Sequence, residues 1–122
     1  MFRKLNSLNI MEKFMLLIRQ DLEEVNQMTK EEYQVRLDLM LGWVAQLTET
    51  GNFITAEPLL TTGRYVTKTE VLSDGPFIEA KEAVSGYFII NAENLDQAVS
   101  LAKQCPQILT NDVVIEVRPI RL

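Results

Sequence analysis

The sequence contains no histidine, and its one cysteine is Cys105. Without histidine the chain cannot form a Ser–His or Cys–His nucleophile pair, a histidine general base, or a zinc or iron site with histidine ligands. A metal site would need oxygen ligands alone, and we expect neither a metal nor a cofactor. A single cysteine cannot form an internal disulfide, which agrees with a reducing compartment and leads us to expect a cytoplasmic protein.

Basic residues are few: 12 Lys and Arg stand against 17 Asp and Glu, and the net charge is −5. Nucleic acid requires a cationic face, and here the basic residues are scattered singly. Long apolar runs are also missing, because Phe14 to Ile18 is far shorter than the ~20 residues of a membrane-spanning helix. We therefore expect neither nucleic acid nor a membrane as a partner. With 47% hydrophobic residues, the 122-residue chain is typical of one soluble domain.

The first half of the chain predicts a strand followed by a long helix. The apolar run 14–19 is too short for an independent helix and predicts a buried strand. Thr29, with Glu32 three positions later, has the form of a capping box, and Gly51 is the expected stop. Between them, apolar residues recur at helical spacing and predict a face that packs on a sheet: Tyr33, Leu37, Met40, Val44 and Leu47.

The second half alternates short strands with one more helix. Segments 53–57, 64–67 and 70–73 predict short strands of a hairpin region, and 87–91 predicts a central strand. Asn94, with Gln97 three positions later, predicts a second helix that ends at Pro106, and 113–117 predicts a last strand.

This order of elements is the split βαβ pattern of an α+β, ferredoxin-like fold, with two helices on one face of a largely antiparallel sheet. We expect Phe14, Leu16, Phe88 and Ile90 to lie on the face away from the helices, where they are too apolar for contact with water. A second copy of the chain is the simplest cover, so we expect a homodimer.

The most distinctive motif is Asp74-Gly75-Pro76-Phe77, followed by Glu79, Lys81 and Glu82 and then by Gly86-Tyr87-Phe88. Asp-Gly-Pro is a tight chain reversal. Together these residues resemble the signature of the YCII-related, or DGPF-domain, family. The resemblance begins at Met11, so we expect residues 1–10 to be an extension or to follow an upstream start codon, and 11–122 to be the domain. It implies a dimeric α+β barrel, in which two sheets face each other, and no cofactor.

The candidate site residues gather around this turn. We expect Asp74 to act as general acid or base and Tyr87 as a hydrogen-bond donor, with Glu79 and Lys81 at the mouth of a cavity. Arg64 would favour an anionic substrate. The structural interpretation stays open: Asp74 accepts hydrogen bonds from its own turn, and Lys81 and Glu82 are surface charges.

Trp43 and Cys105 fit structural roles better than functional ones. We expect Trp43 on the long helix to be a core or interface residue. Cys105 stands beside Pro106 at a predicted helix end, where the negative dipole potential raises a thiol pKa, and we interpret it as a small inert apolar residue.

Two functions remain open. In the first, a pocket of each subunit handles a small organic acid or lactone, since the resemblance implies chemistry on muconate-type compounds. In the second, the protein is a non-catalytic dimer that binds a ligand or another protein and acts in regulation, since DGPF-domain proteins often accompany alternative sigma factors. The missing histidine favours the second.

Overall fold

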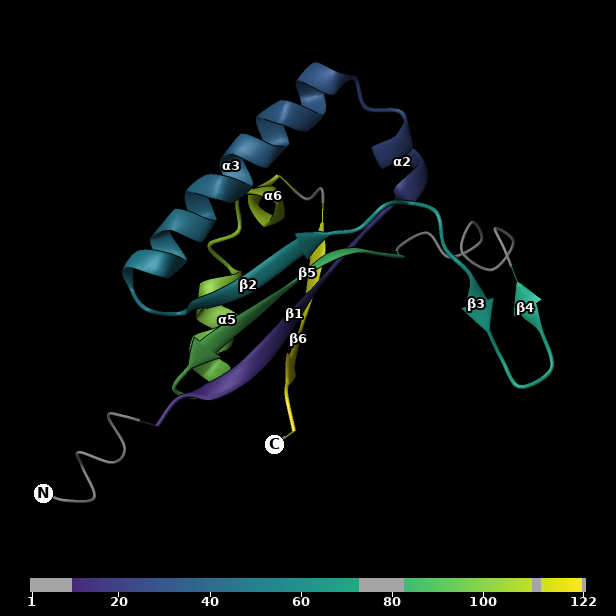
Figure 1. Cartoon of the computed structure of the whole chain (residues 1–122). Helices are drawn as coiled ribbons and strands as arrows, with labels where there is room; N and C mark the ends of the chain where they lie inside the picture. The colour runs from purple at the N-terminus through teal and green to yellow at the C-terminus, as the bar shows by residue number, and fades with distance from the viewer. Residues whose placement is uncertain (1–9, 73–82, 111–112, 122) are drawn as a thin grey trace, which may run out of the picture.

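The structure is a computed structural model that describes residues 10–72, 83–110 and 113–121. Its main sheet has four antiparallel strands in the order β2-β5-β1-β6 (Figure 1). The strands are β1 (Glu12–Gln20), β2 (Phe53–Pro58), β5 (Ala83–Ala92) and β6 (Val114–Pro119). This α+β arrangement, with β1 and β5 central, is compatible with the expected ferredoxin-like topology.

The two long helices begin at the predicted residues. Helix α3 (Lys30–Glu49) is capped by Thr29, whose Oγ1 accepts from the Glu32 backbone N–H at 3.1 Å. Helix α5 (Leu95–Ala102) is capped by Asn94, whose Oδ1 accepts from the Gln97 N–H at 2.8 Å. These side chains satisfy N–H groups that have no partner within the helix.

The predicted C-terminal end is correct for one of these two helices. Gly51 follows α3 with φ of 76°, a left-handed conformation suited to glycine. The prediction for α5 was wrong: the helix ends at Ala102, and Pro106 instead opens a short helix, α6 (Pro106–Leu109). Proline is well tolerated at a first helical position, because its missing N–H has no partner there. A second short helix that the sequence analysis missed, α2 (Leu22–Asn26), follows β1.

The assignment of the two sheet faces was wrong. Phe14, Leu16 and Ile90 have 0% exposure and Phe88 has 5%, and all belong to the core that the helices cover. The helical side chains in the same cluster are Trp43, Leu47, Ala98 and Ala102. Alternation along a strand separates two faces but does not say which face a helix covers.

The face opposite the helices is formed by the alternate residues of the strands. On the two central strands these are Met15, Leu17, Tyr87 and Ile89, which pair across β1 and β5 as Met15 with Ile89 and Leu17 with Tyr87. All four are half-buried. We call these four residues the open face of the sheet. The helices α3, α5 and α6 lie on the other side of the sheet, so they do not cover this apolar face.

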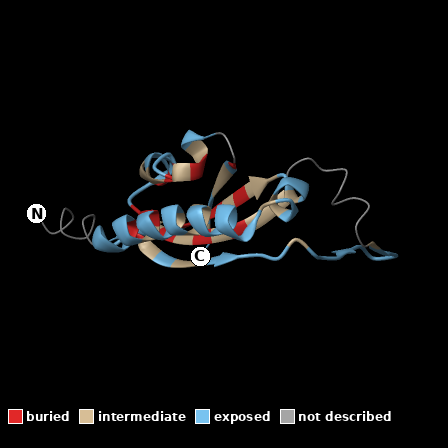
Figure 2. Cartoon of the chain, turned by 90° about the horizontal axis from the view of Figure 1, so that it is seen from above, coloured by how far each residue is buried: buried red, intermediate tan, exposed pale blue. Residues whose placement is uncertain are grey.

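The predicted hairpin forms a separate two-stranded sheet, β3 (Tyr65–Val66) with β4 (Val71–Leu72). It extends away from the main sheet, as Figures 1 and 2 both show. Tyr65, Val66 and Val71 are 52%, 70% and 65% exposed. Within the described ranges, no helix is long and apolar enough to cross a membrane.

Candidate functional site

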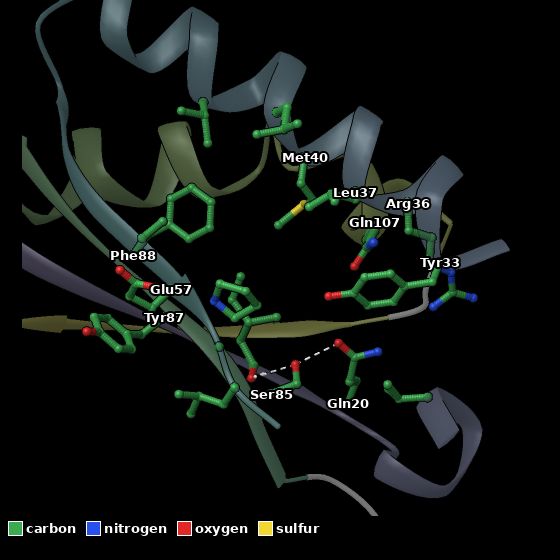
Figure 3. A pocket seen from close by; sticks show the side chains of 18 of the residues that line it. Gln20, Tyr33, Arg36, Leu37, Met40, Glu57, Ser85, Tyr87, Phe88 and Gln107 are labelled. Atoms are coloured by element: carbon green, nitrogen blue, oxygen red, sulfur yellow. Dashed lines mark hydrogen bonds between the residues drawn. The ribbon is translucent and has the colours of Figure 1, made fainter. Parts of the chain in front are cut away.

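A cavity of about 280 Å³ lies between α3 and the sheet, next to the end of β1. Its walls come from α2, α3, β2 and β5 together with α6 (Figure 3). Most of the lining is apolar: Ile18, Val25, Met28, Leu37, Met40, Leu41, Val44, Phe53, Ala56, Pro58, Leu59 and Phe88. Ligand sites are concave and mostly apolar with a few polar groups, so this cavity is the candidate functional site.

Two polar side chains of the cavity wall, those of Ser85 and Gln20, are joined by a hydrogen bond. Ser85 on β5 donates its hydroxyl hydrogen to Oε1 of Gln20 on β1, with an oxygen–oxygen distance of 2.6 Å. The Ser85 Oγ also lies 3.4 Å from the Ile18 carbonyl oxygen. This pair lies where β1 shifts register against β5, between Ile18 and Arg19. The hydrogen bond between Ser85 and Gln20 links the two central strands beside the cavity.

Arg36 brings a positive charge to the cavity wall. It lies on α3 one turn from both Tyr33 and Met40, so the guanidinium emerges from the face of the helix that lines the cavity. Its Nη2 is 3.8 Å from Oε1 of Glu24, and the Arg36 side chain is 23% exposed against 58% for Glu24. The cation is therefore the more buried partner, and it is positioned between the cavity and α2.

Helix α2 closes one side of the cavity with Val25, and Met28 adds to this side from the segment between α2 and α3. Its first turn is capped by Asp21, whose Oδ1 accepts from the Glu23 N–H at 2.9 Å. Its last residue, Asn26, accepts a hydrogen bond at 2.8 Å from the hydroxyl of Thr61, a residue in the segment that follows β2. Since α2 has no fully buried residue, this bond and the Arg36–Glu24 pair are two polar contacts that join it to the rest of the described chain.

Gln107 is the most buried polar side chain of the cavity wall, with 8% exposure. It is the second residue of α6, directly after Pro106. Its carboxamide makes no side-chain hydrogen bond to any residue that the structure describes. Figure 3 shows the carboxamide and the Tyr33 hydroxyl extending into the cavity from different helices. A buried amide of this kind has unused donor and acceptor capacity.

The residues expected from the sequence are distributed differently. Tyr87 touches the cavity edge, but it belongs to the open face, and in Figure 3 its ring is turned away from Tyr33 and Gln107. Arg64 is exposed and donates from Nη1 to the Gly63 carbonyl oxygen at 2.8 Å, outside the cavity lining. The expectations for Asp74, Glu79 and Lys81 fall outside the described residues.

Sequence reasoning missed Arg36, Gln107 and the lining role of Tyr33. A signal for Arg36 was present, because a cation stands three residues after Tyr33 and four before Met40, inside an apolar stripe. The stripe itself was identified correctly, but it was assigned wholly to packing. No comparable signal marks Gln107, which reaches the cavity only because α6 packs near α3.

The structural interpretations of Trp43 and Cys105 hold. Trp43 is 2% exposed and packs on Phe88, and Cys105 is fully buried. Burial raises the pKa of the Cys105 thiol, and hydrogen bonds from the Gln107 and Ile108 backbone N–H groups offset part of that rise. The expected cause was wrong, since Cys105 precedes α6 instead of ending a helix. Within residues 10–72, 83–110 and 113–121, no three Cys, Asp or Glu side chains gather as a metal site.

Comparison with known proteins identifies a family for this chain. A family model described as "YCII-related domain" matches residues 13–122. The matched range includes the four strands of the main sheet and the helices α2, α3, α5 and α6, and it omits only Glu12, the first residue of β1. No curated protein matches the chain.

Proposed function

The chain belongs to the YCII-related family, and on that premise we propose that it binds a small organic acid in the cavity between α3 and the sheet. The observation that supports this most is Arg36, whose side chain is 23% exposed, in the wall of a mostly apolar cavity. The other polar residues of the lining include Gln20, Glu57, Ser85 and Gln107. A guanidinium binds carboxylates well because its N–H groups form a planar fork. The apolar lining then contacts the rest of the molecule.

The size of the cavity limits the ligand. Ligand sites commonly enclose ~300–1,000 Å³, and this cavity, at about 280 Å³, is near the lower end of that range. A monocyclic or short branched acid fits such a volume, whereas a nucleotide or a peptide does not. A lactone is the uncharged alternative of the same size.

A binding experiment tests this proposal. We expect benzoate or cyclohexanecarboxylate to raise the melting temperature, since a ligand at a hundred times its Kd adds about 2.7 kcal/mol to stability. Benzamide, which lacks the charge, should bind more weakly. Arg36→Gln should abolish the carboxylate effect, and the matched control Arg64→Gln should keep it, because Arg64 lies outside the cavity lining. Carboxylate binding that ignores Arg36 would contradict the proposal.

Catalysis is a separate proposal, carried by the resemblance and by Asp74 as general acid or base. The chain can supply acid–base chemistry only from carboxylates, lysines, tyrosines and its single thiol, because it has no histidine. With a substrate in hand, Asp74→Asn should abolish turnover without loss of binding. Unchanged turnover would remove Asp74 from the mechanism and leave a binding protein.

We also propose that the protein is a homodimer of the dimeric α+β barrel type, formed through the open face. Met15, Leu17, Tyr87 and Ile89 present an apolar surface on the central strands, and monomers seldom expose large contiguous apolar patches. A twofold axis lets the same patch cover itself in a second copy. The homodimer is therefore proposed on these four residues, in place of the four that the sequence had suggested.

Light scattering after size exclusion tests the dimer. We expect twice the chain mass of 14.0 kDa for the wild type. Leu17→Lys should give a monomer, because it places a charge on the open face. The matched control Leu109→Lys should remain dimeric, since Leu109 lies on α6 and is 75% exposed. A monomeric wild type at tens of micromolar protein would refute the proposal.

A second candidate function is a non-catalytic regulatory role through a protein partner such as an alternative sigma factor. The observation that favours it is the projecting hairpin with exposed Val66 and Val71. Titration of a purified alternative sigma factor with the protein tests this role directly. Binding lost on Val66→Asp and kept in Arg36→Gln would support it, and an absence of binding would argue against it.

A further inference from the structure

We propose that Gln107 selects the ligand, and that the preferred ligand is a small organic acid with a second hydrogen-bonding group, of the hydroxy-acid or oxo-acid class. This inference rests on the proposed function, because it assumes that a carboxylate binds beside Arg36. It adds a second point of recognition in the same cavity.

The burial of Gln107 is the first observation. The residue is more than nine-tenths buried, its carboxamide is directed into the cavity, and no hydrogen bond joins that carboxamide to a described residue. The carboxamide N and O are not among the fully enclosed polar atoms without a partner in the described residues, so they face the space of the cavity. Buried polar groups in folded proteins are almost always hydrogen-bonded. A cavity wall can leave such a group without a protein partner if the bound molecule supplies the partner.

The position of the two polar residues is the second observation. Arg36 approaches the cavity beside α2, where Glu24 lies 3.8 Å from its Nη2. Gln107 approaches from α6, near Met40, whose Sδ is 3.7 Å from the sulfur of Cys105 two residues before Gln107. The guanidinium thus reaches the cavity from α3, on the side of α2, and the carboxamide reaches it from α6. A ligand that contacts both needs two polar groups on an apolar frame.

The chemistry of the amide narrows the second group. A carboxamide carries two N–H donors and one acceptor oxygen, so it pairs with a hydroxyl in either direction and with a carbonyl through its N–H. A methyl group or a halogen at that position would leave the amide without a partner. Sites that hydrogen-bond a substrate group discriminate strongly against the analogue that lacks it, because the buried polar group is then unpaired.

Paired ligands test the inference. Titration calorimetry would compare benzoate with 3- and 4-hydroxybenzoate, and cyclohexanecarboxylate with its 3- and 4-hydroxy derivatives. We expect at least one hydroxy acid to bind about tenfold more tightly than its parent, the ratio expected for one hydrogen bond to a buried group. Gln107→Met keeps the length of the side chain and removes the amide, so it should bring each pair to within about twofold.

Two further variants make the result specific. Gln104→Met is the matched control, an exposed glutamine outside this cavity that should leave the preference intact. Gln107→Asn keeps the amide but withdraws it by one methylene, so it should also reduce the preference, and it serves if Gln107→Met does not fold. The ligand-free melting temperature of Gln107→Met should equal or exceed that of the wild type, since an unpartnered buried amide has been replaced by an apolar group.

The failures of the two proposals are distinguishable. If acids bind in an Arg36-dependent manner but hydroxy acids and parents bind equally, the role of Gln107 is overturned and the proposed function stands. A preference that persists in Gln107→Met overturns it as well, as does an equal loss of affinity for every acid, which would place Gln107 at the carboxylate. If no acid binds to the wild type, both proposals fail.

Discussion

Trp43 on α3 packs against Phe88 on β5, with ring centroids 4.6 Å apart and planes inclined by 33°. Phe88 in turn meets Phe53 on β2 edge-on, at 6.1 Å and 81°. Phe53 and Phe88 both line the cavity, whereas Trp43 belongs to the core behind them. The core and the cavity therefore share one aromatic wall, so the shape of the cavity depends on how α3 is fixed to the sheet.

Removal of Trp43 should be severely destabilising. Trp43→Ala should lower the free energy of unfolding by about 3–5 kcal/mol, the usual cost of truncating a buried aromatic residue to alanine. Equilibrium urea denaturation measures this change. The control Leu109→Ala, at a side chain that is 75% exposed, should change stability by less than about 0.5 kcal/mol. A small effect of Trp43→Ala would contradict its place in the core.

Replacement of glycine by alanine should stabilise the protein at one position and destabilise it at two others. Gly42→Ala, in the middle of α3 with nothing within 4 Å of the added carbon, should stabilise by about 0.5–1 kcal/mol. Gly51→Ala should destabilise by about 1–2 kcal/mol, because φ is +76° there. Gly86→Ala should also destabilise, since the added carbon would lie 3.0 Å from the Glu57 carbonyl oxygen. Thermal unfolding of the three variants gives the order, and equal effects would refute it.

Stability should depend on pH through Glu116. Hydrogen bonds from Arg118 and Arg19, at 3.2 and 3.1 Å, hold the pKa of this carboxyl below its usual range. Because the folded-state pKa is depressed, the contribution is fully present above the unfolded pKa of ~4.3 and is lost as the pH falls through the folded pKa. Glu116→Gln should flatten melting temperature against pH in this acidic range, and 1 M salt should reduce the difference from wild type, since the Glu116 side chain is 35% exposed. A steeper acid dependence in Glu116→Gln would contradict the sign.

Cys105 should be inert in the native protein. The thiol is fully buried and burial raises its pKa, so little thiolate is present at neutral pH and reagents cannot reach it. Labelling with a chromogenic disulfide should be slow in buffer and rapid and complete in 6 M guanidinium. Cys105→Ala gives the zero of the assay. Rapid labelling of the native protein would place the thiol at a surface or at an open cavity.

The sequence predicted the order of strands and helices well because the relevant signals are local. Thr29 and Asn94 cap the helices that they were expected to cap, and Gly51 ends α3. The strand containing Tyr87 was identified from its apolar run, although β5 extends from Ala83 to Ala92. A cap or an apolar run needs only residues within a turn or a strand of each other, and such residues are contiguous in the sequence.

The residues that line the cavity were harder to predict because they meet only through the fold. Arg36 and Gln107 are 71 positions apart, and α6 brings the second of them to the cavity. The sheet faces show the same limit, since Leu16 and Leu17 look alike in the sequence and only packing decides which one the helices cover. Arg64 shows the converse: a cation near the motif in sequence lies outside the cavity lining.

Helix α2 contributes Val25 to the cavity, and the segment after it contributes Met28, although α2 has no fully buried residue of its own. Substitutions in such a segment cost little stability, whereas substitutions in the aromatic wall opposite are severely penalised. Folding therefore constrains one part of the cavity wall more than the other, and substitutions between Asp21 and Met28 can reshape the cavity while the sheet stays intact.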